Sequence, residues 1–371
     1  MRGSALRRLT EAGVSLWLDD ISRAGLTGGS LAELVRDRRI SGVTSDPAVL
    51  ARALTAGTDY AEQLSVLAAG GATPEEAAWE LMTHDLRHAC DLLLPVYERT
   101  GGADGLVSAE VDPRLAHDSA ATLAQARELS REIGRPNLLV KIPATDAGEK
   151  AVADCLAEGI GVNATLIFSA ERCRRIAAAH VDGVARAAAA GHRVAGINSV
   201  ASFSVGRVDT AVDALLDLDG SAEAKALRGT VALAAARLAH EQHTTVYEDP
   251  RWPALERSGA RRQRLLWAST AVKNPDYPDT HYVDGLIVPN TVSTMPEETL
   301  RAVADHGLTR TAAWDESARA HARHVFECMS WFNISLRDIT SQLEEEGLKQ
   351  LTASWHRLLD TVAPTLDGAP R

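Results

Sequence analysis

The chain has 371 residues, of which 45% are hydrophobic and 24% charged, and its formal net charge is −11 at pH 7. This composition is typical of a globular protein that is long enough for one large barrel or two modest domains. The negative charge argues against general nucleic-acid binding and against docking on an acidic membrane surface. No apolar run approaches the roughly 20 residues of a membrane helix, and the first residues lack a secretory signal. We therefore expect a cytoplasmic protein.

Short β-branched and apolar runs alternate along the chain with longer helical stretches. Eight of these runs are candidate strands, at residues 15–19, 40–45, 106–111, 137–144, 162–168, 194–203, 264–270 and 282–289. Helical patterns lie between some of them, at residues 121–134, 147–159 and 169–191, with apolar residues three to four positions apart. This alternation predicts βα units around parallel strands.

A doubly wound sheet and a closed barrel both fit this alternation. Eight strand candidates favour the barrel, and no GxGxxG turn follows the first strand to indicate a dinucleotide-binding sheet. We predict an α/β fold, a single (β/α)8 TIM-type barrel domain spanning residues 1–371. Residues 296–371 are expected to form a helical extension packed on the barrel, most clearly at 341–363.

The cysteines and histidines show no pattern of a metal site. Cys90, Cys155, Cys173 and Cys328 lie far apart without CxxC spacing, and the twelve histidines form no HExxH pair. We interpret the cysteines as buried free thiols. Neither a metal ion nor another cofactor is expected.

A barrel of this type carries its chemistry at the C-terminal ends of its strands. The polar residues at or just beyond the predicted strand ends are Asp19, Asp46, Glu110, Lys141, Asn163, Thr165, Ser202, Arg207, Ser269 and Lys273. They include one lysine within an apolar strand, several carboxylates and two cations that could hold an anion.

Lys141 stands in the apolar run LLVKIPAT, residues 138–145. A buried lysine is usually paired, extended to the surface, or held partly neutral for chemistry. In a dry barrel its pKa is expected to be depressed, so that the amine can attack a carbonyl and form a Schiff base. The protonated imine would stabilise a neighbouring carbanion and allow carbon–carbon cleavage. Asp19 and Glu110 are suited to the accompanying proton transfers.

The motifs together resemble the transaldolases, in particular the long bacterial form of these class I Schiff-base enzymes. The similarity runs through VSLWLDDISR (14–23), GVTSDPAVL (42–50), VSAEVDPRLAHD (107–118), LLVKIPAT (138–145), GIGVNATLIFS (159–169), SVASFSVGRVDT (199–210), the stretch beginning LLWASTAVKNP (265–275) and QLEEEG (342–347). Each piece alone is a weak signal. Their order and spacing over nearly the whole chain make the resemblance specific.

The resemblance implies transfer of a dihydroxyacetone unit in the pentose phosphate pathway. The donor would be a ketose phosphate such as sedoheptulose 7-phosphate or fructose 6-phosphate, and the acceptor an aldose phosphate. Lys141 would form the Schiff base, and Asp19 would be the acid/base for the hydroxyl at the bond being broken. Glu110 and Thr165 would hold the water that assists imine formation and hydrolysis.

The resemblance also implies which residues bind the substrate. Asn163 and Ser202 would bind hydroxyls of the dihydroxyacetone unit. Arg207, Ser269 and Lys273 would receive the terminal phosphate, since cations near a dianion supply both orientation and attraction. The expected partners are therefore small sugar phosphates, and the protein is expected to be a monomer or a homodimer.

Two residues depart from the family pattern within the expected substrate site. Asp46 stands where the family usually has the asparagine of Thr-Asn-Pro, and an ionised carboxylate only accepts hydrogen bonds. Ser204 stands where the family usually has an aromatic residue near the imine. Two alternatives therefore stay open. One is a Schiff-base aldolase or specialised sugar-biosynthesis transferase with an altered donor or acceptor; the other is a catalytically silent barrel that binds sugar phosphates or a protein.

Several of these residues also have a purely structural interpretation. Lys141 could be a core lysine that is paired or reaches the surface, and Lys273 could be a solvated loop residue. Asp19 could be a helix N-cap, although we expect Asp20 to be that cap. Glu110 could belong to a solvated charge cluster with Asp112 and Arg114, and Arg207 could form a salt bridge with Asp209.

Overall fold

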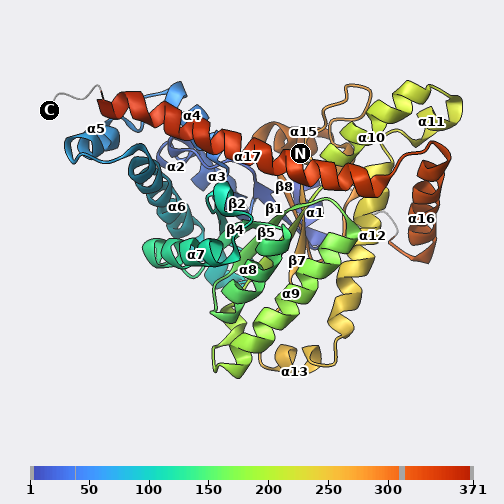
Figure 1. Cartoon of the computed structure of the whole chain (residues 1–371), viewed down its shortest axis with the longest axis horizontal. Coiled ribbons are helices and arrows are strands. Elements are labelled where there is room, and N and C mark those ends of the chain that lie inside the picture. The colour runs from blue at the N-terminus through green and yellow to red at the C-terminus, as the bar shows by residue number, and fades with distance from the viewer. Residues whose placement is uncertain (1–3, 38, 309–313, 368–371) are drawn as a thin grey trace.

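The fold is a closed barrel of eight parallel strands in chain order, surrounded by helices (Figure 1). The computed structural model describes residues 4–37, 39–308 and 314–367. The strands are β1 (Val14–Leu18), β2 (Gly42–Thr44), β3 (Leu106–Glu110), β4 (Leu138–Pro143), β5 (Val162–Ile167), β6 (Ser199–Ser204), β7 (Arg264–Ala268) and β8 (Thr291–Met295). The predicted (β/α)8 barrel is confirmed.

Seventeen α-helices lie in the described part of the chain. They are α1 (Ser4–Glu11), α2 (Arg23–Thr27), α3 (Ser30–Arg36), α4 (Pro47–Ala56), α5 (Ala61–Ala69), α6 (Pro74–Arg99), α7 (Ser119–Ile133), α8 (Asp146–Ala157), α9 (Ala170–Ala189), α10 (Gly206–Asp219), α11 (Ala222–Leu227), α12 (Val231–Thr245), α13 (Trp252–Arg257), α14 (His281–Gly285), α15 (Glu297–His306), α16 (Glu316–Trp331) and α17 (Leu336–Asp367). Short 3-10 turns lie at Pro113–Leu115, Val194–Gly196 and Val246–Glu248. No helix among the described residues is long and apolar enough to cross a membrane.

The eighth predicted strand was wrong. Residues 282–289 fall mostly in α14 and the loop after it, and the strand that closes the barrel is β8, with the sequence TVSTM. The apolar run was misleading because Tyr282, Val283 and Ile287 are buried without being part of the sheet. Conversely, the hydroxyl residues of β8 hid a fully buried strand from a hydrophobicity pattern. The sixth prediction began too early, because the chain makes a 3-10 turn before β6 starts at Ser199.

Polar side chains gather toward the C-terminal ends of most strands inside the barrel, above a layer of apolar side chains. Residues two apart in a strand point to the same face, so Leu139 and Lys141 both face the barrel interior from β4. Trp17 of β1 and Asp19, which directly follows β1, do the same. The apolar interior cluster is formed by Trp17, Leu106, Leu139, Val200, Leu266 and Val292. This cluster fills the barrel below the strand ends and leaves the polar residues at the C-terminal end.

The long helix α17 crosses the C-terminal end of the barrel (Figure 1). It packs against α4, α5 and α6, and also against α10 and β5. The guanidinium of Arg114 lies 5.9 Å from the ring of Trp355 in α17, a cation–π contact that helps to fix the helix. Residues 309–313 and 368–371 of the predicted helical extension lie outside the described residues.

Candidate active site

One cavity of about 200 Å³ at the C-terminal end of the barrel collects ten of the eleven predicted site residues. These ten are Asp19, Asp46, Glu110, Lys141, Asn163, Thr165, Ser202, Ser204, Arg207 and Ser269. They come from consecutive strand ends around the barrel, which explains how residues far apart in sequence share one space. The exception is Lys273.

Lys141 lies at the side of this cavity against a carboxylate. Its Nζ is 3.3 Å from Oε2 of Glu110 and 3.4 Å from the backbone oxygen of Ser45. The Lys141 side chain is 12% exposed and that of Glu110 only 1%. The amine is therefore nearly removed from bulk solvent, is paired, and faces a cavity that can admit a ligand.

The expected depression of the Lys141 pKa was wrong. Burial acts to lower this pKa, but the carboxylates of Glu110, Asp46 and Asp19 outweigh burial and raise it above its usual value. Without ligand, the Lys141 side chain is therefore an ammonium. A dry environment alone predicts a lowered pKa for the amine, but three carboxylates around one cation outweigh it.

The same excess of negative charge acts on Glu110. Burial, together with the negative charges of Asp46 and Asp19, raises the pKa of Glu110 to about 7 against the lowering effect of Lys141. Glu110 can therefore exchange a proton near neutral pH. Its Oε1 has no hydrogen-bond partner among the described residues. The alternative of a solvated charge cluster fails, because Asp112 pairs with Arg114 at 2.6 Å while Glu110 points into the barrel.

Asp19 follows β1 and is oriented by the neighbouring strand. Its Oδ1 accepts a hydrogen bond of 2.6 Å from Oγ1 of Thr44, the last residue of β2. Thr44 also lines the cavity and was missing from the predicted set. The N-cap expected at Asp20 was wrong: Ser22 caps α2 by accepting from the backbone N–H of Gly25. Asp19 is thus held at the cavity and not at a helix start.

Asp46 has a structural role as well as a place in the cavity. It is the N-cap of α4, and its Oδ1 accepts from the backbone N–H of Ala48 at 2.6 Å, with Pro47 at the start of the helix. Capping involves one of its two carboxylate oxygens. Its charge nevertheless acts on Glu110, Lys141 and Arg207.

A buried hydrogen-bond chain fixes the neutral polar groups across the barrel interior. Ser202 donates to Oδ1 of Asn163 at 2.6 Å, and Nδ2 of Asn163 donates to Oγ of Ser108 at 2.9 Å. The chain links β6, β5 and β3. It sets the orientation of the Asn163 amide beside Lys141, whose Cα is paired with that of Asn163 in the sheet.

Thr165 reaches the cavity next to an irregularity in β5. The register between β5 and β6 shifts between Ala164 and Ile167, and Leu166 has a φ of 60°. A positive φ is an unusual conformation for a leucine. The irregularity turns both Thr165 and Leu166 toward the cavity, although neighbouring strand residues normally face opposite sides.

Arg207 follows β6 and lies at the edge of the cavity. Burial lowers its pKa, while the charges of Asp46 and Glu346 act in the opposite direction. The alternative of a salt bridge with Asp209 is not realised, because Asp209 accepts from the backbone N–H of Ala232 at 2.7 Å. Lys273 is exposed and lines a neighbouring cavity of about 390 Å³ that Arg207 also lines.

The cavity also contains residues that the sequence argument missed. Thr294 was missed because the eighth strand was misplaced, and the strand-end rule would have found it on TVSTM. Gly347 and Leu351 come from α17. Gly347 ends the quoted motif QLEEEG, but nothing local in that motif places a helix over the barrel.

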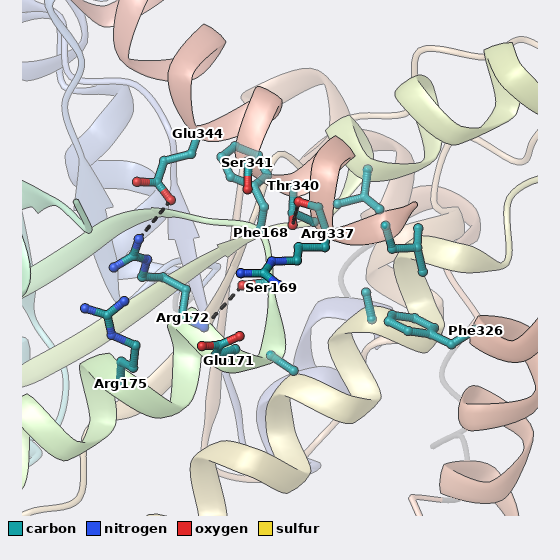
Figure 2. Close-up of a pocket in the computed structure, with 14 residues that line it drawn as sticks. Phe168, Ser169, Glu171, Arg172, Arg175, Phe326, Arg337, Thr340, Ser341 and Glu344 are labelled. Atoms are coloured by element: carbon teal, nitrogen blue, oxygen red, sulfur yellow. Dashed lines mark hydrogen bonds and ion pairs between the residues drawn. The ribbon is translucent and has the colours of Figure 1, made fainter. Parts of the chain in front are cut away.

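A larger cavity of about 430 Å³ lies outside the barrel mouth, between α9, α12, α16 and α17 (Figure 2). It contains none of the predicted site residues. Arg172 and Arg175 at its wall form ion pairs with Asp146 at 2.9 Å. Among the described residues, no group of three or more His, Cys, Asp or Glu side chains is placed to hold a metal ion.

A family model described as Transaldolase/Fructose-6-phosphate aldolase matches residues 16–362. The chain belongs to this family. Transaldolase 1 of Streptomyces avermitilis is 48% identical over 367 residues, covering 98% of this chain and 96% of the relative. The transaldolase of Thermobifida fusca is 50% identical over 367 residues, with 98% and 99% covered, and that of Mycolicibacterium smegmatis is 49% identical over 366 residues, with 99% and 98% covered.

Family membership confirms the resemblance inferred from the motifs. The family description names two kinds of enzyme, a transaldolase and a fructose-6-phosphate aldolase.

Proposed function

We propose that this protein is a transaldolase, a transferase that moves a dihydroxyacetone unit from a ketose phosphate to an aldose phosphate through a Schiff base on Lys141. The observation that carries this proposal is the position of the Lys141 amine. It is buried, borders the cavity at the strand ends and lies 3.3 Å from a carboxylate that titrates near pH 7. The transaldolases that match nearly the full length of the chain support the same reaction.

The first half of the reaction forms the imine. Lys141 loses a proton, and Glu110 is positioned to accept it. The neutral amine attacks the ketone carbon of the donor, and the carbinolamine then loses water to give a protonated imine. Glu110 and Thr165 serve this step by holding the water that carries the protons.

The second half breaks and remakes a carbon–carbon bond. Asp19 takes the proton of the donor hydroxyl, the bond beside that carbon breaks, and the electron pair moves into the protonated imine to give an enamine. The aldose phosphate leaves, and an acceptor aldehyde takes its place. The enamine attacks this aldehyde, Asp19 returns the proton, and water hydrolyses the imine to release the new ketose.

The remaining residues bind the substrate in this proposal. Asn163 and Ser202, already linked by a hydrogen bond of 2.6 Å, offer polar groups to the dihydroxyacetone hydroxyls. Arg207 and Ser269 hold the terminal phosphate at the cavity edge. Lys273 contributes charge from the neighbouring cavity, which is a less direct role than the sequence suggested.

Trapping of the imine tests the proposal. Incubation with fructose 6-phosphate and borohydride should add one reduced dihydroxyacetone unit to the peptide that contains Lys141, as seen by mass analysis. Lys141→Met should give no adduct and no turnover, and Lys150→Met, which changes an exposed lysine, should behave as the wild type. An adduct elsewhere, or none, would refute the assignment.

A second candidate is an aldolase, or a transferase in specialised sugar biosynthesis, that keeps the Schiff base and uses a different donor or acceptor. Asp46 and Ser204 line the cavity and favour this candidate. Asp46 adds a negative charge to the site, and the small side chain of Ser204 leaves room for a substrate of a different shape. Product analysis separates the cases: free dihydroxyacetone released without acceptor indicates an aldolase, and strict dependence on acceptor indicates a transaldolase. Binding of sugar phosphates by calorimetry without any turnover would indicate a silent barrel.

The cellular context is part of the same proposal. A transaldolase belongs to the pentose phosphate pathway, and we place the protein in the cytoplasm because its four cysteines are buried free thiols, which fits a reducing compartment. We further propose that it acts as one domain, with α15 to α17 as an extension of the barrel, and as a monomer or homodimer.

A further inference from the structure

Helix α17 supplies one wall of the candidate site from outside the barrel. Gly347 and Leu351 line the same cavity as Lys141, whereas Gln350 lies beside Arg207 and Lys273 on the neighbouring cavity. Arg207 lines both cavities. Its guanidinium therefore lies at their boundary, under the Gly347–Gln350 turn of α17.

Arg207 is held by a neutral partner. Nη2 of Arg207 donates a hydrogen bond to Oε1 of Gln350. The carboxylates of Asp46 and Glu346 influence the pKa of Arg207 through their charge, and neither is a hydrogen-bond partner of Arg207 in the described part of the chain. The guanidinium is thus oriented by an amide and keeps its full charge.

Helix α17 passes close over Arg207. A Cβ atom on Gly347 would lie 2.8 Å from Cδ2 of Leu166 and 3.2 Å from Nη1 of Arg207, so a larger residue here would have to displace one of these side chains. Three residues earlier, Glu344 points toward Arg172 of α9, and their side chains pair at 3.4 Å (Figure 2). These contacts hold Gln350 in register with Arg207.

We infer that Gln350 is a positioning residue for phosphate recognition, which orients Arg207 toward the terminal phosphate of the sugar without neutralising it. This inference rests on the proposed function. An amide fits the role because it accepts one N–H of the guanidinium and leaves four N–H donors and the positive charge available. A carboxylate at this position would form an ion pair with Arg207 and compete with the phosphate, and a small side chain would leave the guanidinium unoriented.

The test uses two variants of the full chain and one matched control. Gln350→Glu and Gln350→Ala change the partner of Arg207. Lys349→Gln makes the same change of net charge as Gln350→Glu at the adjacent exposed residue, whose nearest ionic partner is Glu345 at 3.9 Å. Each protein is assayed with fructose 6-phosphate and with unphosphorylated fructose as donors, and its affinity for inorganic phosphate is measured by calorimetry.

Gln350→Glu should raise KM for fructose 6-phosphate about tenfold and weaken phosphate binding by a similar factor, with kcat nearly unchanged. Gln350→Ala should raise KM about threefold. The kcat/KM for fructose should change little in either variant, and Lys349→Gln should match the wild type. An unchanged KM in Gln350→Glu, or an equal loss with both donors, would overturn the inference.

The proposed function can fail separately. If the wild type does not turn over sugar phosphates, the transaldolase assignment fails. The role of Gln350 is then decided by the phosphate affinities alone: weaker binding in Gln350→Glu than in Lys349→Gln supports it, and equal binding refutes it.

Discussion

Glu110 and Lys141 are paired residues of β3 and β4, and their side chains meet 3.3 Å apart inside the barrel. Adjacent strand ends thus bring a proton acceptor to the amine without any loop. Because Glu110 has a pKa of about 7 and the pKa of Lys141 is raised, the resting pair holds its proton on the amine at neutral pH and must pass it on before the amine can attack.

The first prediction concerns the pH dependence of the reaction. If Glu110 acts as a base, it is active as a carboxylate, so kcat/KM should rise with pH through a limb near pH 7. Glu110→Gln should lower kcat by about 100-fold or more and remove this limb. The pH profiles of kcat/KM for both proteins provide the measurement. A limb near pH 7 that persists in Glu110→Gln would assign it to another group.

The second prediction concerns Asp46. Asp46→Asn removes one negative charge near Lys141 and Glu110, so the pKa of both groups should fall. The amine then becomes neutral at lower pH, and turnover of fructose 6-phosphate should rise severalfold. Asparagine caps a helix about as well as aspartate, so α4 should remain intact.

Asp46→Ala separates the two roles of the side chain. It removes the same charge but also the bond to Ala48, and should cost about 1 kcal/mol of folding free energy. Chemical denaturation of both variants gives this difference. If turnover of Asp46→Asn is unchanged or lower than that of the wild type, the aspartate is adapted to the enzyme's own substrate.

The sequence was sufficient to predict the barrel because the pattern of strands can be recognised without knowing how the side chains pack. Seven of the eight strands were located, and the interior change from Leu139 to Lys141 follows from the alternation of strand side chains alone. The eighth strand was missed because TVSTM is buried on both faces yet rich in hydroxyl groups. Burial of such residues is decided by neighbours that are distant in sequence.

The strand-end rule gathered most of the site for the same reason. It could not place Lys273, which lies on a loop, or Gly347 and Gln350, which a helix brings over the barrel from the C-terminal part of the chain. The strand-end rule also could not predict the direction in which the Lys141 pKa shifts, because this direction depends on how three carboxylates balance the effect of burial.

The third prediction concerns two buried histidines outside the site. Burial lowers the pKa of both His180 and His243 to about 3. Because an unfolded histidine titrates near pH 6.5, each should cost about 2 kcal/mol of stability as the pH falls from 7 to 5. Glu110 and Asp209, whose pKa values are raised to about 7, act in the opposite direction over this range.

The measurable quantity is therefore a difference between proteins. His243→Gln removes one titrating imidazole, so its unfolding free energy should fall between pH 7 and pH 5 by about 2 kcal/mol less than that of the wild type. Urea unfolding at the two pH values gives the comparison, whatever the absolute stability of the variant. Equal slopes would show that His243 does not stay neutral in the folded protein.

The fourth prediction concerns the apolar floor of the barrel. Gly42 is paired with Trp17 between β2 and β1, and a Cβ atom on Gly42 would lie 2.5 Å from the fully buried indole ring. Gly42→Ala should therefore destabilise the fold by about 1–3 kcal/mol, because a close-packed interior has no room for a displaced tryptophan. Gly196→Ala is the matched control, since a Cβ there meets no atom within 4 Å. Thermal unfolding of both variants decides the matter: a Gly42→Ala variant as stable as Gly196→Ala would mean that the indole can move aside, and that the cavity above it is less rigidly supported than the packing implies.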